Sequence, residues 1–218
     1  MKILKKSFNQ YLNKNYLFEK RPTIAVAVSG GPDSMCLIYL LKNWINGNRG
    51  SLVALIIDHQ LRKESKEESY LIKEYLLKNK IYTKIIKINK KLVIKKNMKE
   101  ARENRFAKLI KYCNHKNIFH LFLAHHYDDN IETFLIRKLS GSNFQGLRGM
   151  QYKSINNSIQ ILRPLLFNTK KEILEFNLNN KIFYINDPSN LKTKYTRVAI
   201  RNFLNKNKIF HKKNKKRF

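Results

Sequence analysis

The apolar residues in the first two thirds of the chain fall into short continuous runs that alternate with longer amphipathic segments. Runs rich in β-branched and other apolar residues predict strands at residues 23–28, 52–57, 83–88 and 120–124. Segments with helical patterning predict helices at residues 33–45, 64–78, 101–113 and 128–139. Strands that are apolar throughout and are separated by helices are typical of a parallel sheet covered on both faces. The pattern therefore predicts an α/β fold with a Rossmann-like parallel sheet between helices.

After Gly141 this alternation stops and turn signals become frequent. SGSNFQGLRGM at 140–150 predicts a loop, RPLL at 163–166 leads into a helix at about 169–178, and DPSN at 187–190 predicts a turn. The expected parts are a helical lead-in at 1–22, the main α/β domain at 23–150, a small, mostly helical C-terminal extension at 151–205, and a basic tail at 206–218.

The sharpest motif, SGGPDS, joins the first predicted strand to the first predicted helix. Its residues are Ser29, Gly30, Gly31, Pro32, Asp33 and Ser34. The glycines permit positive φ and a close backbone approach, the serines add hydroxyl groups, and the proline is harmless in the first turn of a helix. The N–H groups that open the helix favour an anion. The motif predicts a phosphate or pyrophosphate site, whereas an ordinary capped turn would explain only the aspartate and one glycine.

The predicted helix at 101–113 has two arginines beside its apolar stripe. The stripe has the spacing i, i+3, i+4, i+7 and consists of Phe106, Leu109, Ile110 and Cys113. Arg102 precedes Phe106 by four residues and Arg105 precedes Leu109 by four, so both lie on or beside the buried side. A functional role is one interpretation, and the alternative is that both side chains extend into solvent.

Three carboxylates begin the predicted helix at 128–139. Asp128, Asp129 and Glu132 are spaced so that they can face one way at the helix start. Acidic residues are favoured there by the helix dipole, which is the structural explanation. The chain has only 15 acidic residues, so three within five positions also indicate a binding site.

The net charge of +30 and the isoelectric point near 10.2 predict a polyanionic partner, with nucleic acid as the first candidate. Lys, Asn and Ile are frequent throughout the chain, so compositional bias is an alternative source of this charge. The sequence does not reveal the oligomeric state.

The two cysteines, Cys36 and Cys113, are far apart and form no CxxC motif. This pattern favours a reducing cytoplasm and argues against a disulfide framework or a cysteine-built metal site. The apolar runs are much shorter than the roughly 20 residues of a membrane span. The N-terminus has no apolar segment typical of a secretory signal. We therefore expect a cytoplasmic protein without a membrane partner.

SGGPDS resembles the SGGxDS signature of the PP-loop ATP pyrophosphatases, which have the adenine nucleotide α-hydrolase-like fold. In that superfamily the loop holds pyrophosphate while ATP is cut between its α- and β-phosphates, so no P-loop lysine is required. Further motifs resemble those of the tRNA(Ile)-lysidine synthases, in the same order over residues 22–201. They are DHQLR at 58–62, AREN-RF at 101–106, AHHYDDNIETFLIRKLSGSNFQGLRGM at 124–150, RPLL at 163–166 and DPSN at 187–190.

This resemblance implies a ligase that forms a carbon–nitrogen bond. It implies conversion of the wobble cytidine in the CAU anticodon of an isoleucine tRNA to lysidine, with ATP and free lysine as substrates and Mg²⁺ as the expected metal. Residues 23–150 would be the PP-loop nucleotide-binding catalytic domain and residues 151–205 its extension.

The resemblance also implies residue roles. The six residues of SGGPDS would bind ATP, with Asp33 placing Mg²⁺. The catalytic set would be Asp33, Arg102, His125, Asp129 and Glu132. Asp128, Asp129 and Glu132 would bind lysine. His125 would lie near the nucleotide, and His126 is expected to be a packed structural residue.

Some features depart from the family pattern. Phe106 replaces a tyrosine, and Val198 stands where asparagine is usual. The chain stops soon after Arg201, as expected of a short form without the extra C-terminal domains that help to hold tRNA. Two alternatives remain: a tRNA 2-thiolation enzyme of the same superfamily, which usually requires cysteines, and a basic RNA-binding module without catalysis.

Overall fold

The structure is a computed structural model of the chain. It describes residues 2–58, 63–88, 98–186, 199–200 and 203–204, without the side chains of 2–6, 63–64 and 98–102. The chain forms two compact units. The first comprises Met1–His126 and Tyr152–Asn186, and the second comprises Tyr127–Gln151 and Asp187–Phe218.

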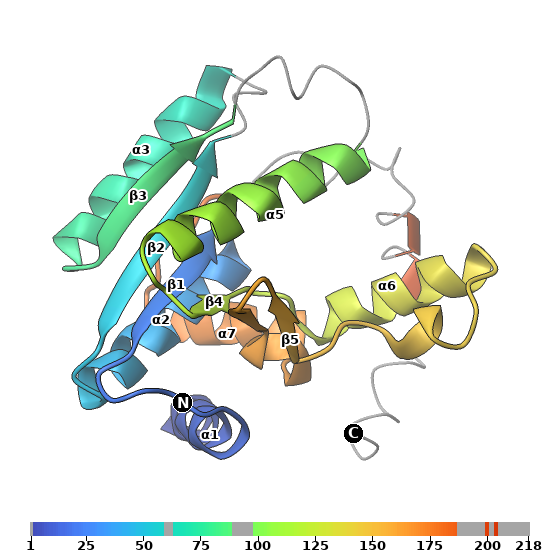
Figure 1. Cartoon of the computed structure of the whole chain (residues 1–218), viewed down its shortest axis with the longest axis horizontal. Coiled ribbons are helices and arrows are strands. Elements are labelled where there is room, and N and C mark those ends of the chain that lie inside the picture. The colour runs from blue at the N-terminus through green and yellow to red at the C-terminus, as the bar shows by residue number, and fades with distance from the viewer. Residues whose placement is uncertain (1, 59–62, 89–97, 187–198, 201–202, 205–218) are drawn as a thin grey trace. The chain divides into compact units, whose positions relative to one another are not determined.

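The first unit is built on a six-stranded sheet with the order β3-β2-β1-β4-β6-β5 (Figure 1). The strands are β1 (Thr23–Val28), β2 (Ser51–Asp58), β3 (Tyr82–Lys87), β4 (His120–Phe122), β5 (Lys153–Asn156) and β6 (Ile159–Leu162). All neighbouring strands are parallel except β5 and β6. The predicted parallel α/β fold is thereby confirmed, with one antiparallel strand added at an edge.

Helices cover both faces of this sheet. The helices of the first unit are α1 (Lys2–Asn15), α2 (Pro32–Gly47), α3 (Lys63–Lys78), α5 (Met98–His115) and α7 (Lys170–Asn179). Buried side chains of α2, α3 and α7 share one apolar cluster, and those of α5 belong to a second cluster. No helix within the described ranges is long and apolar enough to cross a bilayer.

The central strand β1 divides its side chains between the two clusters. Ile24, Val26 and Val28 belong to the cluster with α2, whereas Ala25 belongs to the cluster with α5. This alternation follows from the two-residue period of a strand. Because both faces are covered, β1 is apolar throughout, and that continuous apolar run is what made the strand predictable.

The sequence did not predict the hairpin of β5 and β6. The four residues of β5 are Lys-Ser-Ile-Asn, and a segment this short and polar carries no clear strand pattern. Asn157 and Ser158 connect the strands with φ values of 44° and 67°, as in hairpin turns that require positive φ. Part of the segment predicted as a mostly helical extension therefore completes the sheet, because β6 pairs with β4.

The predicted N-terminal helix is present as α1, and the segment after it is fixed to the sheet. Phe8 and Leu12 of α1 are buried in the α2 cluster, and the Trp44 indole donates to Asn13 Oδ1 at 2.9 Å. Farther on, Glu19 Oε2 lies 2.6 Å from Nε2 of the buried His120. An imidazole bonded to a carboxylate through Nε2 carries its proton on that nitrogen. This link joins the lead-in to β4.

The pKa of Glu19 is shifted by two opposing influences. Burial disfavours the charged carboxylate and would raise the pKa, but the hydrogen bond and charge interaction with His120 and backbone hydrogen bonds outweigh burial, so the pKa is lowered. A lowered carboxyl pKa stabilises the fold above the unfolded-state pKa. That stability is lost as the pH falls through the folded-state pKa.

We predict that Glu19→Gln is less stable than the wild type at pH 7, and that the difference shrinks as the pH falls below the ordinary Glu value of 4.5. Urea unfolding of both proteins at a series of pH values measures the difference in their free energies of unfolding. Acid also destabilises both proteins in a general way, but that shared effect cancels in the difference. The exposed Glu175→Gln is the matched loss of a negative charge and should show a smaller difference. A gap between wild type and Glu19→Gln that persists unchanged in acid would contradict the prediction.

Candidate functional site

The first unit places residues from three predicted motifs at one edge of the sheet. The neighbours β1, β2 and β4 are parallel, so their carboxyl ends lie on the same side. The motif SGGPDS follows β1, Asp58 ends β2, and His125 and His126 come shortly after β4. In open parallel sheets this edge is where ligands bind.

The loop after β1 is held by its own two serines. The Ser34 hydroxyl donates to Gly31 O at 3.0 Å and accepts from Ser29 N at 3.2 Å. The Ser29 hydroxyl lies 3.3 Å from Ser34 Oγ and accepts from Gly31 N at 3.4 Å. Because the Ser34 proton is used on Gly31 O, the Ser29 hydroxyl is the donor between the two serines. The serines thus shape the loop.

This arrangement leaves the start of α2 uncapped. Gly31 is the N-cap residue and offers no side-chain hydrogen bond, and Pro32 has no N–H group. The first bond of the helix runs from Met35 N to Gly31 O at 3.1 Å. The N–H groups of Asp33 and Ser34 therefore have no acceptor within the helix. Together with the helix dipole, they form a site suited to a phosphate-sized anion.

Gly30 occupies a position that excludes a side chain. Its φ is +82°, and a Cβ there would lie 2.9 Å from Cγ1 of the buried Ile72. Its carbonyl accepts from Ile185 N at 2.9 Å, so a segment far along the chain also fixes the loop. Gly31 differs, because its φ is −73° and its nearest neighbour would be Ser29 Oγ at 3.5 Å. Only the first glycine is required by the fold.

The Asp33 carboxylate is paired with a cation from α7. Lys170 Nζ donates to Asp33 Oδ1 at 2.5 Å, and Nε2 of the buried His126 lies 3.8 Å from the same oxygen. His126 was expected to be a packed residue, and it is buried, but it also faces Asp33. The aspartate is 28% exposed and Lys170 is 35% exposed, so both groups are accessible from solvent.

Sequence reasoning missed both residues by which α7 contacts this loop. Lys170 carries no local signal, because it lies in an ordinary capping sequence between Thr169 and Glu172. Asn177 donates from Nδ2 to Pro32 O at 2.8 Å and is fully buried. It follows Phe176 on the buried side of α7, and a polar residue in that position was the available signal.

The structure describes some of the other predicted residues but not all of them. Asp58 is buried, and its Oδ1 accepts from the Ser65 hydroxyl at 3.2 Å. The rest of DHQLR at 59–62, all of DPSN and Val198 lie outside the described residues. Arg102 belongs to α5, but its side chain is also outside them. His125 is partly buried in the first unit.

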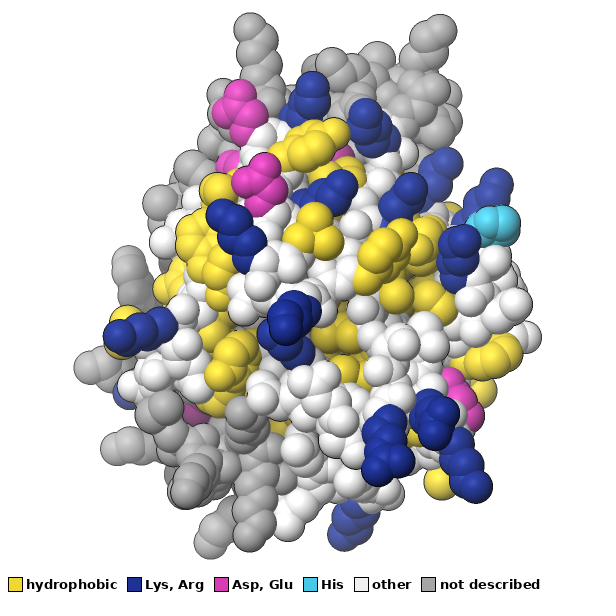
Figure 2. Space-filling model, turned by 90° about the vertical axis from the view of Figure 1, so that its left-hand side faces the viewer, with side chains coloured by type: hydrophobic (Ala, Val, Ile, Leu, Met, Phe, Trp, Pro, Cys, Tyr) yellow, Lys and Arg dark blue, Asp and Glu magenta, His cyan; other side chains and the backbone are white. Residues whose placement is uncertain are grey.

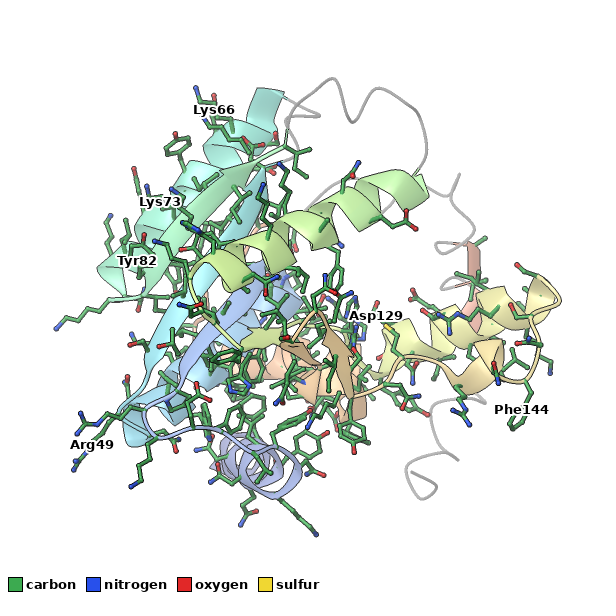
Figure 3. The ribbon with its side chains drawn as sticks, in the orientation of Figure 1. Arg49, Lys66, Lys73, Tyr82, Asp129 and Phe144 are labelled. Atoms are coloured by element: carbon green, nitrogen blue, oxygen red, sulfur yellow. The ribbon has the colours of Figure 1, made fainter. Side chains whose placement is uncertain are left out.

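The predicted acidic group is brought together on one helix of the second unit, α6 (Tyr127–Leu139). Asp128 and Asp129 are in its first turn and are partly buried, whereas Glu132 is only 1% exposed. The Thr133 hydroxyl donates to Asp129 O at 2.8 Å. Figure 3 shows Asp129 near the start of this helix. The three acids therefore share a helix start but differ in exposure.

The cysteines are buried in separate layers. Cys36 belongs to the α2 cluster and Cys113 to the α5 cluster, on opposite faces of the sheet. Burial, with a smaller contribution from the charge of Asp33, raises the pKa of the Cys36 thiol to about 12. Burial raises the pKa of the Cys113 thiol to about 12. Both thiols are therefore protonated and inaccessible, which makes them poor nucleophiles and metal ligands.

No group of three His, Cys, Asp or Glu residues suited to a metal occurs among the residues that the structure describes. Asp33 offers a single accessible carboxylate at the anion site. Mg²⁺ is usually held by one or two carboxylates together with phosphate oxygens of a substrate, rather than by a cage of protein ligands. The donor set thus fits an ion that arrives with a phosphorylated ligand.

Comparisons with known proteins show the family of the chain. The family described as the PP-loop domain matches residues 1–208. The tRNA(Ile)-lysidine synthase of Wolbachia pipientis wMel is 38% identical over 199 residues, which cover 90% of this chain and 46% of that protein. The tRNA(Ile)-lysidine synthase of Orientia tsutsugamushi (strain Boryong) is 36% identical over 187 residues, which cover 86% and 42%. The chain spans a little under half the length of these relatives.

Solved structures share the fold. The U34-tRNA thiolase NcsA from Methanococcus maripaludis, with its [4Fe-4S] cluster, has a TM-score of 0.77 at 17% identity, covering 94% of this chain and 75% of that chain. The NMN synthetase from Francisella tularensis has a TM-score of 0.55 at 15% identity, covering 90% and 76%. At these identities the similarity concerns the fold alone.

We predict that Gly30→Ala lowers the free energy of unfolding by about 2 kcal/mol or more, because it combines a left-handed backbone with a clash in the core. Gly31→Ala is the matched control and should change stability by no more than about 0.5 kcal/mol. Urea unfolding followed by circular dichroism measures both values. Equal stabilities would mean that Ile72 and the loop relax around a Cβ at Gly30.

Proposed function

The chain belongs to the PP-loop domain family, and from this premise we propose that it attaches free lysine to the wobble cytidine of an isoleucine tRNA with a CAU anticodon, at the expense of ATP. The proposal is supported by the relatives of 36% and 38% identity, which are tRNA(Ile)-lysidine synthases. Because the chain spans less than half of their length, the activity of the whole relatives is extended to it as a proposal.

The observation that carries this proposal is the uncapped start of α2 behind a serine-braced loop. Ser29 and Ser34 bond to the loop rather than cap the helix, so the N–H groups of Asp33 and Ser34 remain for an anion. This geometry suits the β- and γ-phosphates of ATP, which leave together as pyrophosphate. It would allow SGGPDS to bind phosphate without the lysine of G-x-x-x-x-G-K-[ST].

In the first step, the C2 oxygen of the wobble cytidine attacks the α-phosphorus of ATP. A phosphorus–oxygen bond forms to the cytidine, the bond to the bridging oxygen breaks, and pyrophosphate leaves. Negative charge builds on phosphate oxygens, so preorganised N–H groups and cations lower the barrier. Arg102 and His125 are proposed to act at the α-phosphate and the nucleotide, as the motif resemblance implies.

Lys170 supplies a cation that the motif itself lacks. In the structure its ammonium neutralises Asp33. Without that pairing, the Asp33 carboxylate would repel a phosphate bound at the start of α2. We propose that Lys170 offsets this repulsion and interacts with the phosphates when ATP binds. Mg²⁺, held by Asp33 and phosphate oxygens, would supply further charge neutralisation.

In the second step, an amino group of lysine attacks C2 of the adenylated cytosine. A carbon–nitrogen bond forms, the carbon–oxygen bond to AMP breaks, AMP leaves, and the amine loses a proton. The carboxylates of Asp128, Asp129 and Glu132 are proposed to bind the amino groups of lysine. A lysine ammonium has a pKa of about 10.4 in water, so it must lose a proton before attack, and Asp129 or Glu132 is a candidate acceptor.

The cysteines argue against 2-thiolation. Sulfur transfer needs an accessible thiolate or an iron–sulfur cluster. This chain has two cysteines, both buried, on opposite faces of the sheet. They cannot reach one another to serve a common centre. The chain therefore shares the fold of the thiolase, but its own cysteines are not placed for sulfur transfer.

We predict that the chain, given ATP and isotope-labelled lysine, adds one lysine to an isoleucine tRNA carrying a CAU anticodon. Glu132→Gln and Asp129→Asn should raise the lysine KM or abolish transfer, while ATP-dependent adenylation continues. Mass spectrometry of the digested tRNA detects the modified cytidine, and arginine in place of lysine is the substrate control. A sulfur-containing cytidine would support thiolation, and an unmodified cytidine with tight tRNA binding would support the non-catalytic RNA-binding module.

We predict that Lys170→Ala lowers the rate of tRNA-dependent AMP formation by about 100-fold or more, since it removes a positive charge beside the phosphates. Lys171→Ala is the matched control, because Lys171 is 85% exposed and lies 3.9 Å from the exposed carboxylate of Glu175. Pyrophosphate release measures the rates, and thermal unfolding checks that both variants fold. Equal rates in the two variants would remove Lys170 from the mechanism.

A further inference from the structure

The loop that follows α6, residues 140–150, exposes a phenylalanine. Phe144 is 83% exposed, and Leu139 at the end of α6 is 76% exposed. Figure 3 shows Phe144 pointing away from the ribbon of this segment. Single exposed apolar residues are common on protein surfaces, so exposure alone assigns no role. Phe144 differs from such residues because its loop has a hydrogen-bonded backbone and carries only positive charge.

The loop is held by an extensive set of hydrogen bonds within the second unit. Arg137 Nη1 donates to Gly146 O at 2.8 Å, and Gly146 N donates to Asn143 Oδ1 at 3.0 Å. Met150 N donates to Asn130 Oδ1 at 2.7 Å, which returns the chain to α6. The carbonyl of Phe144 itself accepts from Leu147 N at 3.2 Å. The aromatic ring is therefore presented on a preorganised backbone, which lowers the entropic cost of binding.

The charge of this segment has one sign. Residues 133–151 contain no Asp or Glu. They contain Arg137, Lys138 and Arg148, of which Lys138 and Arg148 are exposed. Figure 2 shows that on another face, at the side of α3 and β3, basic side chains are mixed with acidic and apolar ones. The loop thus combines an exposed aromatic ring with cations and no compensating acids.

We propose that Phe144 is a stacking platform for an unpaired base of the RNA substrate, with Lys138 and Arg148 contacting neighbouring phosphates. Stacking on an aromatic ring flanked by basic side chains is the usual way in which proteins hold bases of single-stranded RNA loops. One exposed ring is too small a surface for a stable protein–protein interface, which normally buries well over 1,000 Å². In taking tRNA as the RNA, this inference rests on the proposed function.

The test uses the full chain and a hairpin RNA whose loop contains CAU, with 2-aminopurine in place of the adenine. Stacking quenches 2-aminopurine fluorescence, and neither ATP nor lysine is needed. Phe144→Ala should weaken binding by about 5- to 150-fold and abolish the quenching, because stacking contributes about 1–3 kcal/mol per base. Phe144→Trp should retain both. Leu139→Ala is the matched control for an exposed apolar residue of the same unit and should bind as the wild type does.

The salt dependence of RNA affinity distinguishes the contribution of the aromatic ring from that of the basic side chains. Arg148→Ala should reduce the slope of log affinity against log salt by about 0.7, the value for one phosphate contact to a single strand. Phe144→Ala should leave that slope unchanged. Thermal unfolding of each variant confirms an intact fold.

Unchanged RNA binding and unchanged quenching in Phe144→Ala would overturn the inference, because the ring would then contribute nothing to holding the RNA. Equal losses in Phe144→Ala and Leu139→Ala would also overturn it, because a general apolar contact would then be acting. Phe144-dependent quenching by a chain that transfers no lysine would support this inference while refuting the proposed function.

Discussion

An α-helix leaves its first N–H groups without partners, and this constraint organises the edge of the sheet where the candidate site lies. The chain keeps the start of α2 open. Gly31 offers no cap, Pro32 has no N–H, and the Ser34 hydroxyl turns back to the carbonyl of Gly31. A phosphate can therefore be bound mainly by backbone groups whose positions the sheet and the core fix in advance. Such a site needs little rearrangement when the ligand arrives, and the sequence motif is short because the fold does most of the positioning.

That open helix start also carries a negative charge, which is a problem for an anion site. Asp33 interacts favourably with the helix dipole but would repel the phosphate next to it. The structure resolves this with α7, whose Lys170 pairs with Asp33 and whose Asn177 holds the carbonyl of Pro32. These contacts span 137 and 145 positions in the sequence. The loop after β1 and α7 are thus best regarded as one structural assembly, although only the loop has a recognisable motif.

The contrast between local and distant contacts explains what the sequence could predict. β1, α2 and the loop between them were predictable, because an apolar run, a glycine pair and a proline in the first turn are all local signals. The hairpin of β5 and β6 was missed because Lys153–Asn156 is short and polar and becomes a strand only through pairing with β6. Lys170 was missed for a related reason, since its role depends on which helix packs beside α2. His126 was correctly expected to be buried, but its position facing Asp33 required the packing of β4 against β1.

Because both cysteines are buried, their reaction with a thiol reagent can measure local opening of the core. A thiol reagent can react only when a thiol is uncovered and ionised, and each of these thiols lies in a different layer. The labelling rate of Cys36 therefore reports opening of the layer that contains α2, and that of Cys113 reports opening of the layer under α5. Equal opening free energies would mean that the two layers separate from the sheet as one cooperative unit. Unequal values would identify which side of the sheet opens first, and hence whether the loop after β1 belongs to the more stable layer.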